Sequence, residues 1–225
     1  MNILAIILAR KGSKRIKGKN RIVLNKKKLI EHTFYLSKKI KVFKNILLSS
    51  NDEILIKLAK NYRILAPWKR PESLSGDKSS SYKAVIHAYN WYKKNYPDID
   101  GIFLLQPTSP FRSSVTINKM IDLFKLNNKK PVVCVSKCIE HPEQMLSIKN
   151  KKLKPYFSEK YFRYPSQKLK TLYRVNGLGY LINPKTLINE KTLVPKNSIC
   201  YINNSRVETI DIDDKNDLNL ARKIK

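Results

Sequence analysis

The sequence predicts an α/β protein, in which a mostly parallel sheet carries helices on both faces. Short apolar segments alternate with segments of helical periodicity as far as residue 138, and this alternation is typical of parallel sheets. A chain of 225 residues is long enough for one such domain and its core. Polar residues directly follow several of the apolar segments, where α/β proteins bind their ligands.

The expected elements follow one another in a regular order. The strands are apolar and short, and they cover residues 3–9, 46–50, 101–106 and 131–137. Between them, apolar residues recur at helical spacing from Ile54 to Tyr62, from Val85 to Tyr92 and from Ile117 to Phe124. A polar loop with two prolines, residues 66–81, precedes the second of these helices.

The alternation stops between residues 139 and 173, in a segment that is basic, rich in tyrosine and poor in helical periodicity. The pattern resumes with a strand at 178–183, followed by a strand at 207–212 and a final helix at 214–224. We therefore expect one domain over residues 1–225 with an inserted subdomain of hairpins at 139–173.

A glycine-containing basic loop, RKGSKRIKGKN, follows the first strand. It is not a P-loop, because five residues separate Gly12 from Gly18, and Asn20 stands where Ser or Thr would hold magnesium. Its backbone N–H groups and its cations can still surround a polyanion. These cations are Arg10, Lys11, Lys14, Arg15, Lys17 and Lys19. The alternative interpretation is a solvated basic loop.

Two carboxylates occupy alternate positions near the end of the chain. In an extended strand Asp211 and Asp213 would project from the same face, as two ligands of one hard cation must. Asp214 and Asp217 are instead expected to begin the last helix, as its cap and its first-turn carboxylate. A solvated strand end is the alternative for the first pair.

Two further segments bring polar residues to the same edge of the sheet. Gln106 ends a strand, and the prolines that follow it hold the loop rigid, with Ser113 or Ser114 as the next helix cap. Asn176, Gly177 and Tyr180 lie beside the start of the strand after the inserted segment. The alternative interpretation of this segment is structural: its glycine would only serve a turn that other residues cannot adopt.

The candidate site residues, taken together, indicate which kind of reaction the protein could catalyse. The histidines and cysteines show no metal spacing, and the sequence contains no nucleophile elbow and no recognisable Cys–His pairing. A polyanion cradle, a carboxylate pair and a polar pocket together suit phosphoryl or nucleotidyl transfer, in which positioning and charge neutralisation do most of the catalysis.

The formal net charge of +29 raises the possibility of a nucleic-acid partner. The lysines, however, are spread over nearly every predicted helix and loop, and aromatic residues do not alternate with them as stacking platforms would. We expect no nucleic-acid partner and keep a basic nucleic-acid-binding α/β protein as the alternative function.

The first apolar run is too short to cross a bilayer and lacks the features of a signal peptide. With three cysteines that fit buried thiols, we expect a cytoplasmic protein with no membrane partner.

Six stretches resemble, in order and approximate spacing, the cytidylyltransferases of nine-carbon sialic-type sugars, the CMP-sialic acid synthetases. They are ARKGSKRIKGKN, SSNDEI, RPESLSGDKSSS, LLQPTSPFR, YRVNGLGY and IDIDDKNDL. The resemblance implies a three-layer, nucleotide-diphosphosugar transferase-like fold. It also implies transfer of CMP from CTP to the anomeric hydroxyl of a nonulosonic acid, with a pseudaminic acid cytidylyltransferase as the alternative within the class.

The resemblance also implies roles for individual residues. The nucleotide would be contacted by Arg10, Ser13, Lys19 and Asn20, and its cytosine by Arg70, Ser80 and Ser81. The sugar would face Gln106, Asn176 and Tyr180, while Asp211 and Asp213 would carry Mg²⁺. Arg10, Lys19, Asp211 and Asp213 would be the catalytic residues.

The inserted segment 139–173 would form a homodimer and lend basic residues to the partner's sugar site. Family members often show Arg-Arg-Gln ahead of the tyrosine and Asn-Gly of that region. Here Pro165 and Ser166 precede Gln167, and Arg163 is the nearest arginine.

Overall fold

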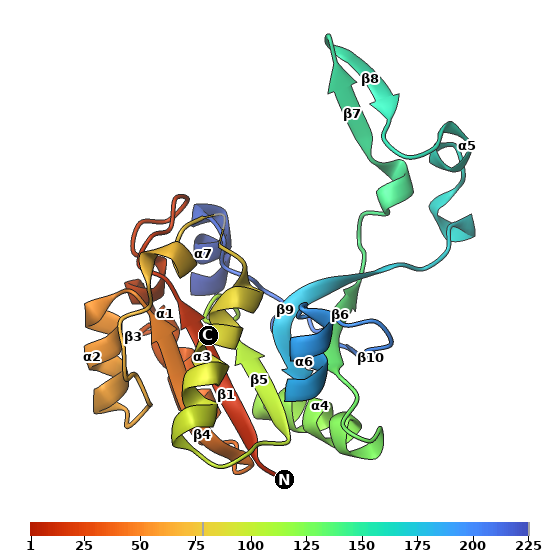
Figure 1. Cartoon of the computed structure of the whole chain (residues 1–225). Coiled ribbons are helices and arrows are strands. Elements are labelled where there is room, and N and C mark those ends of the chain that lie inside the picture. Colours follow the sequence, from red (N-terminus) through yellow and green to blue (C-terminus); the bar gives the residue numbers. More distant parts are fainter. Residues whose placement is uncertain (78, 225) are drawn as a thin grey trace.

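A six-stranded sheet forms the centre of the protein, with strand order β10-β6-β9-β5-β1-β4 (Figure 1). The computed structural model describes residues 1–77 and 79–224; Lys78, part of the RPESLSGDKSSS stretch, lies outside the described residues. The strands of the sheet are β1 (Ile3–Ala9), β4 (Phe43–Ser50), β5 (Gly101–Leu105), β6 (Val132–Lys137), β9 (Tyr173–Ile182) and β10 (Ile199–Ile202). Only β9 runs antiparallel to its neighbours among these described strands. The predicted, mostly parallel sheet is confirmed.

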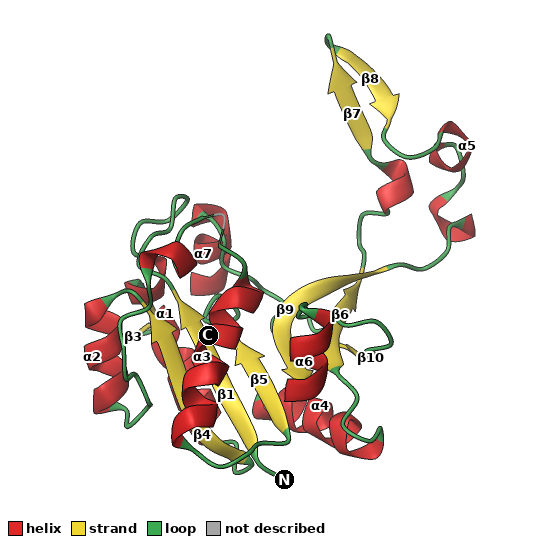
Figure 2. Cartoon of the chain, viewed as in Figure 1, coloured by secondary structure: helices red, strands yellow, loops and turns green. Residues whose placement is uncertain are grey.

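Helices cover both faces of this sheet, as predicted (Figure 2). One layer packs against the apolar cluster that contains Phe34 and Phe124, and the other against the cluster that contains Val85 and Leu187. The first layer consists of α1 (Leu29–Lys38), α2 (Glu53–Asn61) and α4 (Ser114–Leu126). The second consists of α3 (Ser81–Asn95) and α6 (Pro184–Glu190). A last helix, α7 (Lys215–Arg222), covers a third, smaller apolar cluster.

Burial on both faces explains why β1 reads as an unbroken apolar run. Its alternate side chains enter opposite layers, so Ile3 and Ile7 join one cluster while Leu4 and Ile6 join the other. A strand with a solvated face would instead alternate apolar and polar residues. The strand therefore ends where the charge begins, and it delivers the basic loop to one edge of the sheet.

Side-chain caps fix where the helices of this edge begin. The Ser113 hydroxyl accepts a hydrogen bond from the Thr116 backbone N–H at 3.1 Å, so Ser113 is the cap before α4. Asp214 accepts from the backbone N–H groups of Asn216 and Asp217, and the Asp217 carboxylate accepts from the backbone of Asp214. This is the predicted acidic start of the last helix, and it leaves Asp211 and Asp213 free of any capping role.

The predicted strand at 207–212 is wrong. Residues 206–209 form a turn and residues 210–213 have no regular structure. The strand at the β6 side of the sheet is instead β10 (Ile199–Ile202), which the sequence did not suggest. Ile210 and Ile212 alternate like strand residues because both pack into the cluster beneath α7. The strand expected at 178–183 begins earlier, at Tyr173.

The segment between β6 and β9 projects away from the sheet (Figure 1). It contains one antiparallel hairpin, β7 (Leu146–Lys149) with β8 (Lys152–Pro155), and the short helix α5 (Glu159–Phe162). A second small hairpin, β2 (Val23–Leu24) with β3 (Lys27–Lys28), follows the basic loop. Within the described ranges, no helix is long and apolar enough to cross a membrane.

Candidate active site

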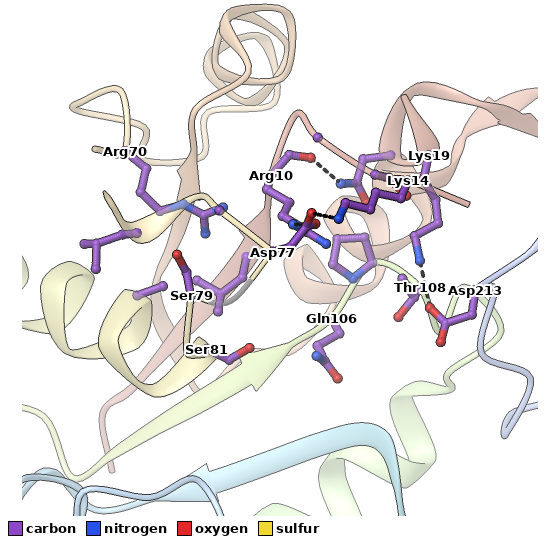
Figure 3. Close-up of a pocket in the computed structure, with 18 of the residues that line it drawn as sticks. Arg10, Lys14, Lys19, Arg70, Asp77, Ser79, Ser81, Gln106, Thr108 and Asp213 are labelled. Carbon is purple, nitrogen blue, oxygen red and sulfur yellow. Dashed lines mark hydrogen bonds and ion pairs between the residues drawn. The ribbon is translucent and has the colours of Figure 1, made fainter. Parts of the chain in front are cut away.

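A cavity of about 640 Å³ lies beyond the carboxyl ends of β1 and β5. Four segments line it: the basic loop after β1, the loop that leads into α3, the turn after β5, and the irregular segment before α7. Most of the predicted site residues line this cavity: Arg10, Ser13, Lys19, Asn20, Arg70, Ser80, Ser81, Gln106, Asp211 and Asp213. In Figure 3, Arg70, Ser79 and Ser81 lie toward one end, and Lys19, Thr108 and Asp213 toward the other.

The basic loop is folded back on itself so that Lys19 faces the carboxylates. Gly18 adopts a left-handed conformation, with φ of 64°, which glycine tolerates best. The Asn20 amide, which is buried, donates to the Arg10 carbonyl at 3.2 Å. The Lys19 ammonium donates to the Ile212 carbonyl at 2.8 Å and to Asp213 Oδ1 at 2.9 Å. Lys19 thus joins the first loop of the chain to its last.

The two carboxylates differ in their surroundings. Burial opposes the ionisation of Asp213, but hydrogen bonds and charge from Lys19 and Arg15 outweigh it and hold its pKa below the ordinary value. Burial raises the pKa of Asp211, and the charge of Asp213 adds to this, while a hydrogen bond with Thr108 acts the other way. Asp211 Oδ1 has no hydrogen-bond partner among the described residues.

This carboxylate pair fits a divalent cation. A buried carboxylate oxygen without a donor, beside a second carboxylate, is the environment that a cation would compensate. The described residues hold no group of three or more His, Cys, Asp or Glu side chains in metal-binding proximity. Mg²⁺ is commonly bound through one or two carboxylates, with waters and substrate phosphates as its other ligands. Asp211 and Asp213 suit that mode of binding.

The opposite end of the cavity is built around Arg70. Its side chain is buried, and its Nε donates to the Ser75 hydroxyl at 3.1 Å. Burial, with the charge of Arg10, lowers the pKa of Arg70 to about 10, so the side chain stays cationic at neutral pH. Ser80 and Ser81 lie beside it at the start of α3. This end offers the hydroxyl groups of Ser80 and Ser81 beside the buried charge of Arg70.

Asp77 is a cavity residue that the sequence reasoning missed. Its carboxylate pairs with Arg10 and with Lys14, the latter at 2.8 Å (Figure 3). Hydrogen bonds from Lys14 and then Arg10 lower the pKa of Asp77, so it is anionic at neutral pH. It stands in a loop with no regular structure, and only the folding of that loop over the cations of the first loop brings the groups together.

Asn176 and Tyr180 do not line the cavity in this structure. The Asn176 amide is buried, where it donates to the Ser136 hydroxyl at 2.9 Å, and its oxygen accepts from the Leu178 backbone N–H. Burial, with the nearby charge of Asp211, raises the pKa of Tyr180. Both residues belong to β9, whose Gly177 lies against the cavity wall formed by Gln106 and Asp211.

Gly177 is the point at which β9 meets that wall. Its φ of +76° is a conformation that L side chains rarely adopt, and a Cβ added there would lie 3.0 Å from Gln106 Oε1. Asp211 Oδ2 would be 3.9 Å from the same Cβ. Glycine at 177 therefore lets the backbone approach both cavity residues closely.

Two solved structures superpose on nearly the whole of this chain. The CMP:2-keto-3-deoxy-manno-octonic acid synthetase complexed with CTP superposes with a TM-score of 0.69 at 15% identity, over 99% of this chain and 98% of that one. The 4-diphosphocytidyl-2C-methyl-D-erythritol synthase of Anaerococcus prevotii gives a TM-score of 0.64 at 16% identity, over 99% and 97% of the two chains. At these identities the likeness concerns the fold.

Curated relatives share more of the sequence with this chain than those solved structures do. The CMP-N,N'-diacetyllegionaminic acid synthase of Legionella pneumophila is 33% identical over 100% of this chain and 96% of its own length. A pseudaminic acid cytidylyltransferase of Campylobacter jejuni is 31% identical, over 99% of this chain and 95% of its own length. The N-acylneuraminate cytidylyltransferase of Escherichia coli is 30% identical over 97% of this chain, which spans 51% of that relative.

The family comparison agrees with these relatives. The model of the family described as cytidylyltransferase matches residues 4–196, which include all of β1 but its first residue, the basic loop, the Arg70 end of the cavity and the whole of β9. The family match covers the basic loop, the loop that leads into α3 and the turn after β5, and the relatives extend the likeness to the segment before α7. The chain belongs to the cytidylyltransferase family.

Proposed function

We propose that this protein transfers CMP from CTP to the anomeric hydroxyl of a nine-carbon α-keto sugar acid and releases pyrophosphate. The observation that carries the proposal is the cavity itself, which brings together the cations of the basic loop, the carboxylate pair and the polar residues Ser80, Ser81 and Gln106. Relatives that act on legionaminic, N-acylneuraminic and pseudaminic acids by name support the choice of acceptor.

In this reaction the anomeric oxygen forms a bond to the α-phosphorus, and the bond from that phosphorus to pyrophosphate breaks. Arg10, Lys14 and Lys19 would neutralise the phosphates, and Ser13 and Asn20 belong to the same loop. Arg70 with Ser80 and Ser81 would bind the cytosine end, and Gln106 the sugar acid. Asp211 and Asp213 would hold Mg²⁺, which neutralises charge on the phosphates and the leaving group when it is bound.

We propose a nine-carbon sugar acid as the substrate class, and within it we expect sialic or legionaminic acid to be preferred over pseudaminic acid. These acids share the carboxylate and the anomeric centre that the reaction needs, so selection depends on how the site meets the ring substituents. Gln106 is the cavity residue we assign to that contact, and we propose that Asn176 and Tyr180 of the neighbouring strand β9 act with it. The free cysteines Cys134, Cys138 and Cys200 suit a reducing compartment, and we place the reaction in the cytoplasm.

The test of this function is pyrophosphate release from CTP with Mg²⁺ and each of the three sugar acids. We expect release with sialic or legionaminic acid and a lower kcat/KM with pseudaminic acid. A pseudaminic preference above about tenfold would reverse the proposed order. Absence of release with all three acids, together with tight RNA binding at physiological salt, would favour the nucleic-acid-binding alternative.

Replacing Asp77 by asparagine is expected to tighten CTP binding about three- to fivefold. Asp77 forms ion pairs with Arg10 and Lys14, and its removal would leave both cations available to the phosphates. Calorimetric titration with CTP at low and at high salt measures this effect, which should shrink as salt screens the ion pairs. Asp122→Asn on α4 is the matched control, since its carboxylate lies 4.0 Å from Lys125. Weaker CTP binding by Asp77→Asn would show that Asp77 assists the nucleotide instead.

The projecting segment 139–173 is proposed to form a homodimer, because it exposes apolar side chains that a monomer would leave in water. These side chains are Met145, Leu146, Ile148, Leu153, Tyr156, Phe157 and Tyr161. In the dimer, its lysines would be available to the partner's sugar site.

We expect light scattering at micromolar concentration to give twice the chain mass. Phe157→Glu should halve the measured mass, because a charge would be buried in the interface. Val115→Glu, an equally exposed position on α4, is the control and should leave the mass unchanged. A monomer mass for the unmodified chain would refute the dimer.

A further inference from the structure

Arg112 is a buried cation that does not line the cavity. The residue is 4% exposed, and burial lowers the pKa of its guanidinium to about 10, so it keeps its charge at neutral pH. In the described part of the chain, no carboxylate lies within ion-pair distance of it. Its Nε and Nη1 have no hydrogen-bond partner there.

Such a residue does not contribute to stability in the usual way. A buried charge without a paired partner loses its hydration, and no Coulomb attraction at close range compensates for the loss. An apolar side chain of similar volume would fill the same space without that cost. The presence of arginine here therefore indicates a use other than packing.

Among the described residues, the one side-chain hydrogen bond of Arg112 closes the turn that carries Gln106. Its Nη2 donates to the Gln106 carbonyl at 2.9 Å, across the two prolines of that turn. On the other side, Gln106 Oε1 faces the Gly177 backbone, 3.0 Å from the position a Cβ would take. Gln106 is thus held at its carbonyl by Arg112 and limited at its side chain by β9.

The same turn also carries the carboxylate segment. The Ile212 backbone N–H, between Asp211 and Asp213, donates to the Thr108 carbonyl at 2.8 Å. The charges of Asp211 and Glu208 favour the charged form of Arg112, although burial opposes it. Arg112 therefore lies where a change in the turn would move both Gln106 and Asp211.

We propose that Arg112 is a positioning residue, which fixes the turn from Gln106 to Arg112 and so holds Gln106 and Asp211 in the geometry that the sugar acid requires. The proposal rests on the proposed function, because it assigns Gln106 to the sugar acid. It adds a residue that lies outside the cavity and acts through two residues that line it.

The experiment compares Arg112→Met, which removes charge and donors, with Arg112→Lys, which keeps the charge. For Arg112→Met we expect KM for the sugar acid to rise and kcat to fall, each by about tenfold, with KM for CTP within about threefold of the unmodified value. The urea midpoint should not fall, because the uncompensated charge is gone. Arg112→Lys should lose about tenfold in kcat/KM. Arg222→Met, at an exposed arginine of α7, is the control and should behave as the unmodified chain.

Two results would overturn the proposal. One is a kcat/KM for Arg112→Met within about threefold of the unmodified chain. The other is a lowered midpoint with both KM values unchanged, which is the signature of a purely structural role. If Arg112→Met does not fold, Arg112→Lys decides: the expected loss at an unchanged midpoint supports positioning, and unmodified kinetics contradict it.

Hydrogen exchange separates this proposal from the proposed function. The Ser109 backbone N–H lies 3.4 Å from the Gln106 carbonyl, inside the turn that Arg112 closes. We expect this amide to exchange about tenfold faster in Arg112→Met, a result that needs no substrate. If the unmodified chain failed to turn over any sugar acid, the proposed function would be wrong, and equal exchange rates would independently refute the positioning role.

Discussion

Replacing Asp211 by asparagine should lower kcat by about 10³-fold, which corresponds to about 4 kcal/mol of transition-state stabilisation. Asparagine keeps the size of the side chain but removes the charge that would hold Mg²⁺ against the phosphates. The loss should be larger at low than at high Mg²⁺, since excess cation partly compensates for a weakened site. Pyrophosphate release measured over a Mg²⁺ titration checks both expectations.

The stability of this variant provides an internal control. Burial raises the pKa of Asp211, so the folded state binds its proton more tightly than the unfolded chain does. The stability linked to this group is present below the unfolded pKa and is lost as pH rises through the folded value. Asparagine does not titrate, and Asp211→Asn should therefore be at least as stable as the unmodified chain at pH 8. A kcat within about threefold at every Mg²⁺ concentration would mean that Asp211 does not hold the metal.

Replacing Lys19 by methionine should lower kcat/KM for CTP by about 10- to 150-fold, the range expected for loss of a hydrogen bond to a charged group. Lys19 is largely enclosed, with 13% of its side chain exposed, so water cannot readily substitute for its ammonium. The same change removes the contacts with the Ile212 carbonyl and Asp213. Steady-state kinetics with varied CTP measure the combined effect.

Lys17 supplies the matched control for this experiment. It belongs to the same loop but is exposed and does not line the cavity. Lys17→Met should change kcat/KM by less than about twofold. If both variants lost activity equally, the loop would act through its overall charge rather than through Lys19, and the assigned geometry would be wrong.

The elements that could be predicted from the sequence are those whose periodicity is local. The unbroken apolar sequence of β1 reflects burial on both faces of the strand, and the helical spacing of apolar residues in α2, α3 and α4 reflects burial on one face. Both patterns can be recognised from neighbouring residues alone. The edge strand β10 could not be predicted, because its pairing with β6 depends on residues far away in the sequence. The alternation at Ile210 and Ile212 misled for the same reason, since a helix rather than a sheet buries them.

The candidate site shows the same division. Arg10, Lys19 and the two carboxylates stand in loops whose composition already indicates a charged ligand, and the fold brings them to one cavity. Asp77 and Arg112 carry no such local signal. A single aspartate after glycine, or an arginine after phenylalanine, is usually solvated, and only the packing of distant loops makes the first a partner of Arg10 and buries the second.

The most direct test of the account follows the anomeric oxygen itself. A sugar acid labelled with ¹⁸O at the anomeric hydroxyl is incubated with CTP, Mg²⁺ and the purified protein, and the products are analysed by mass spectrometry. If the anomeric oxygen attacks the α-phosphorus, the CMP-sugar retains the label and the released pyrophosphate contains none. Pyrophosphate formed together with free CMP, or a CMP-sugar without the label, would contradict cytidylyl transfer to the anomeric hydroxyl.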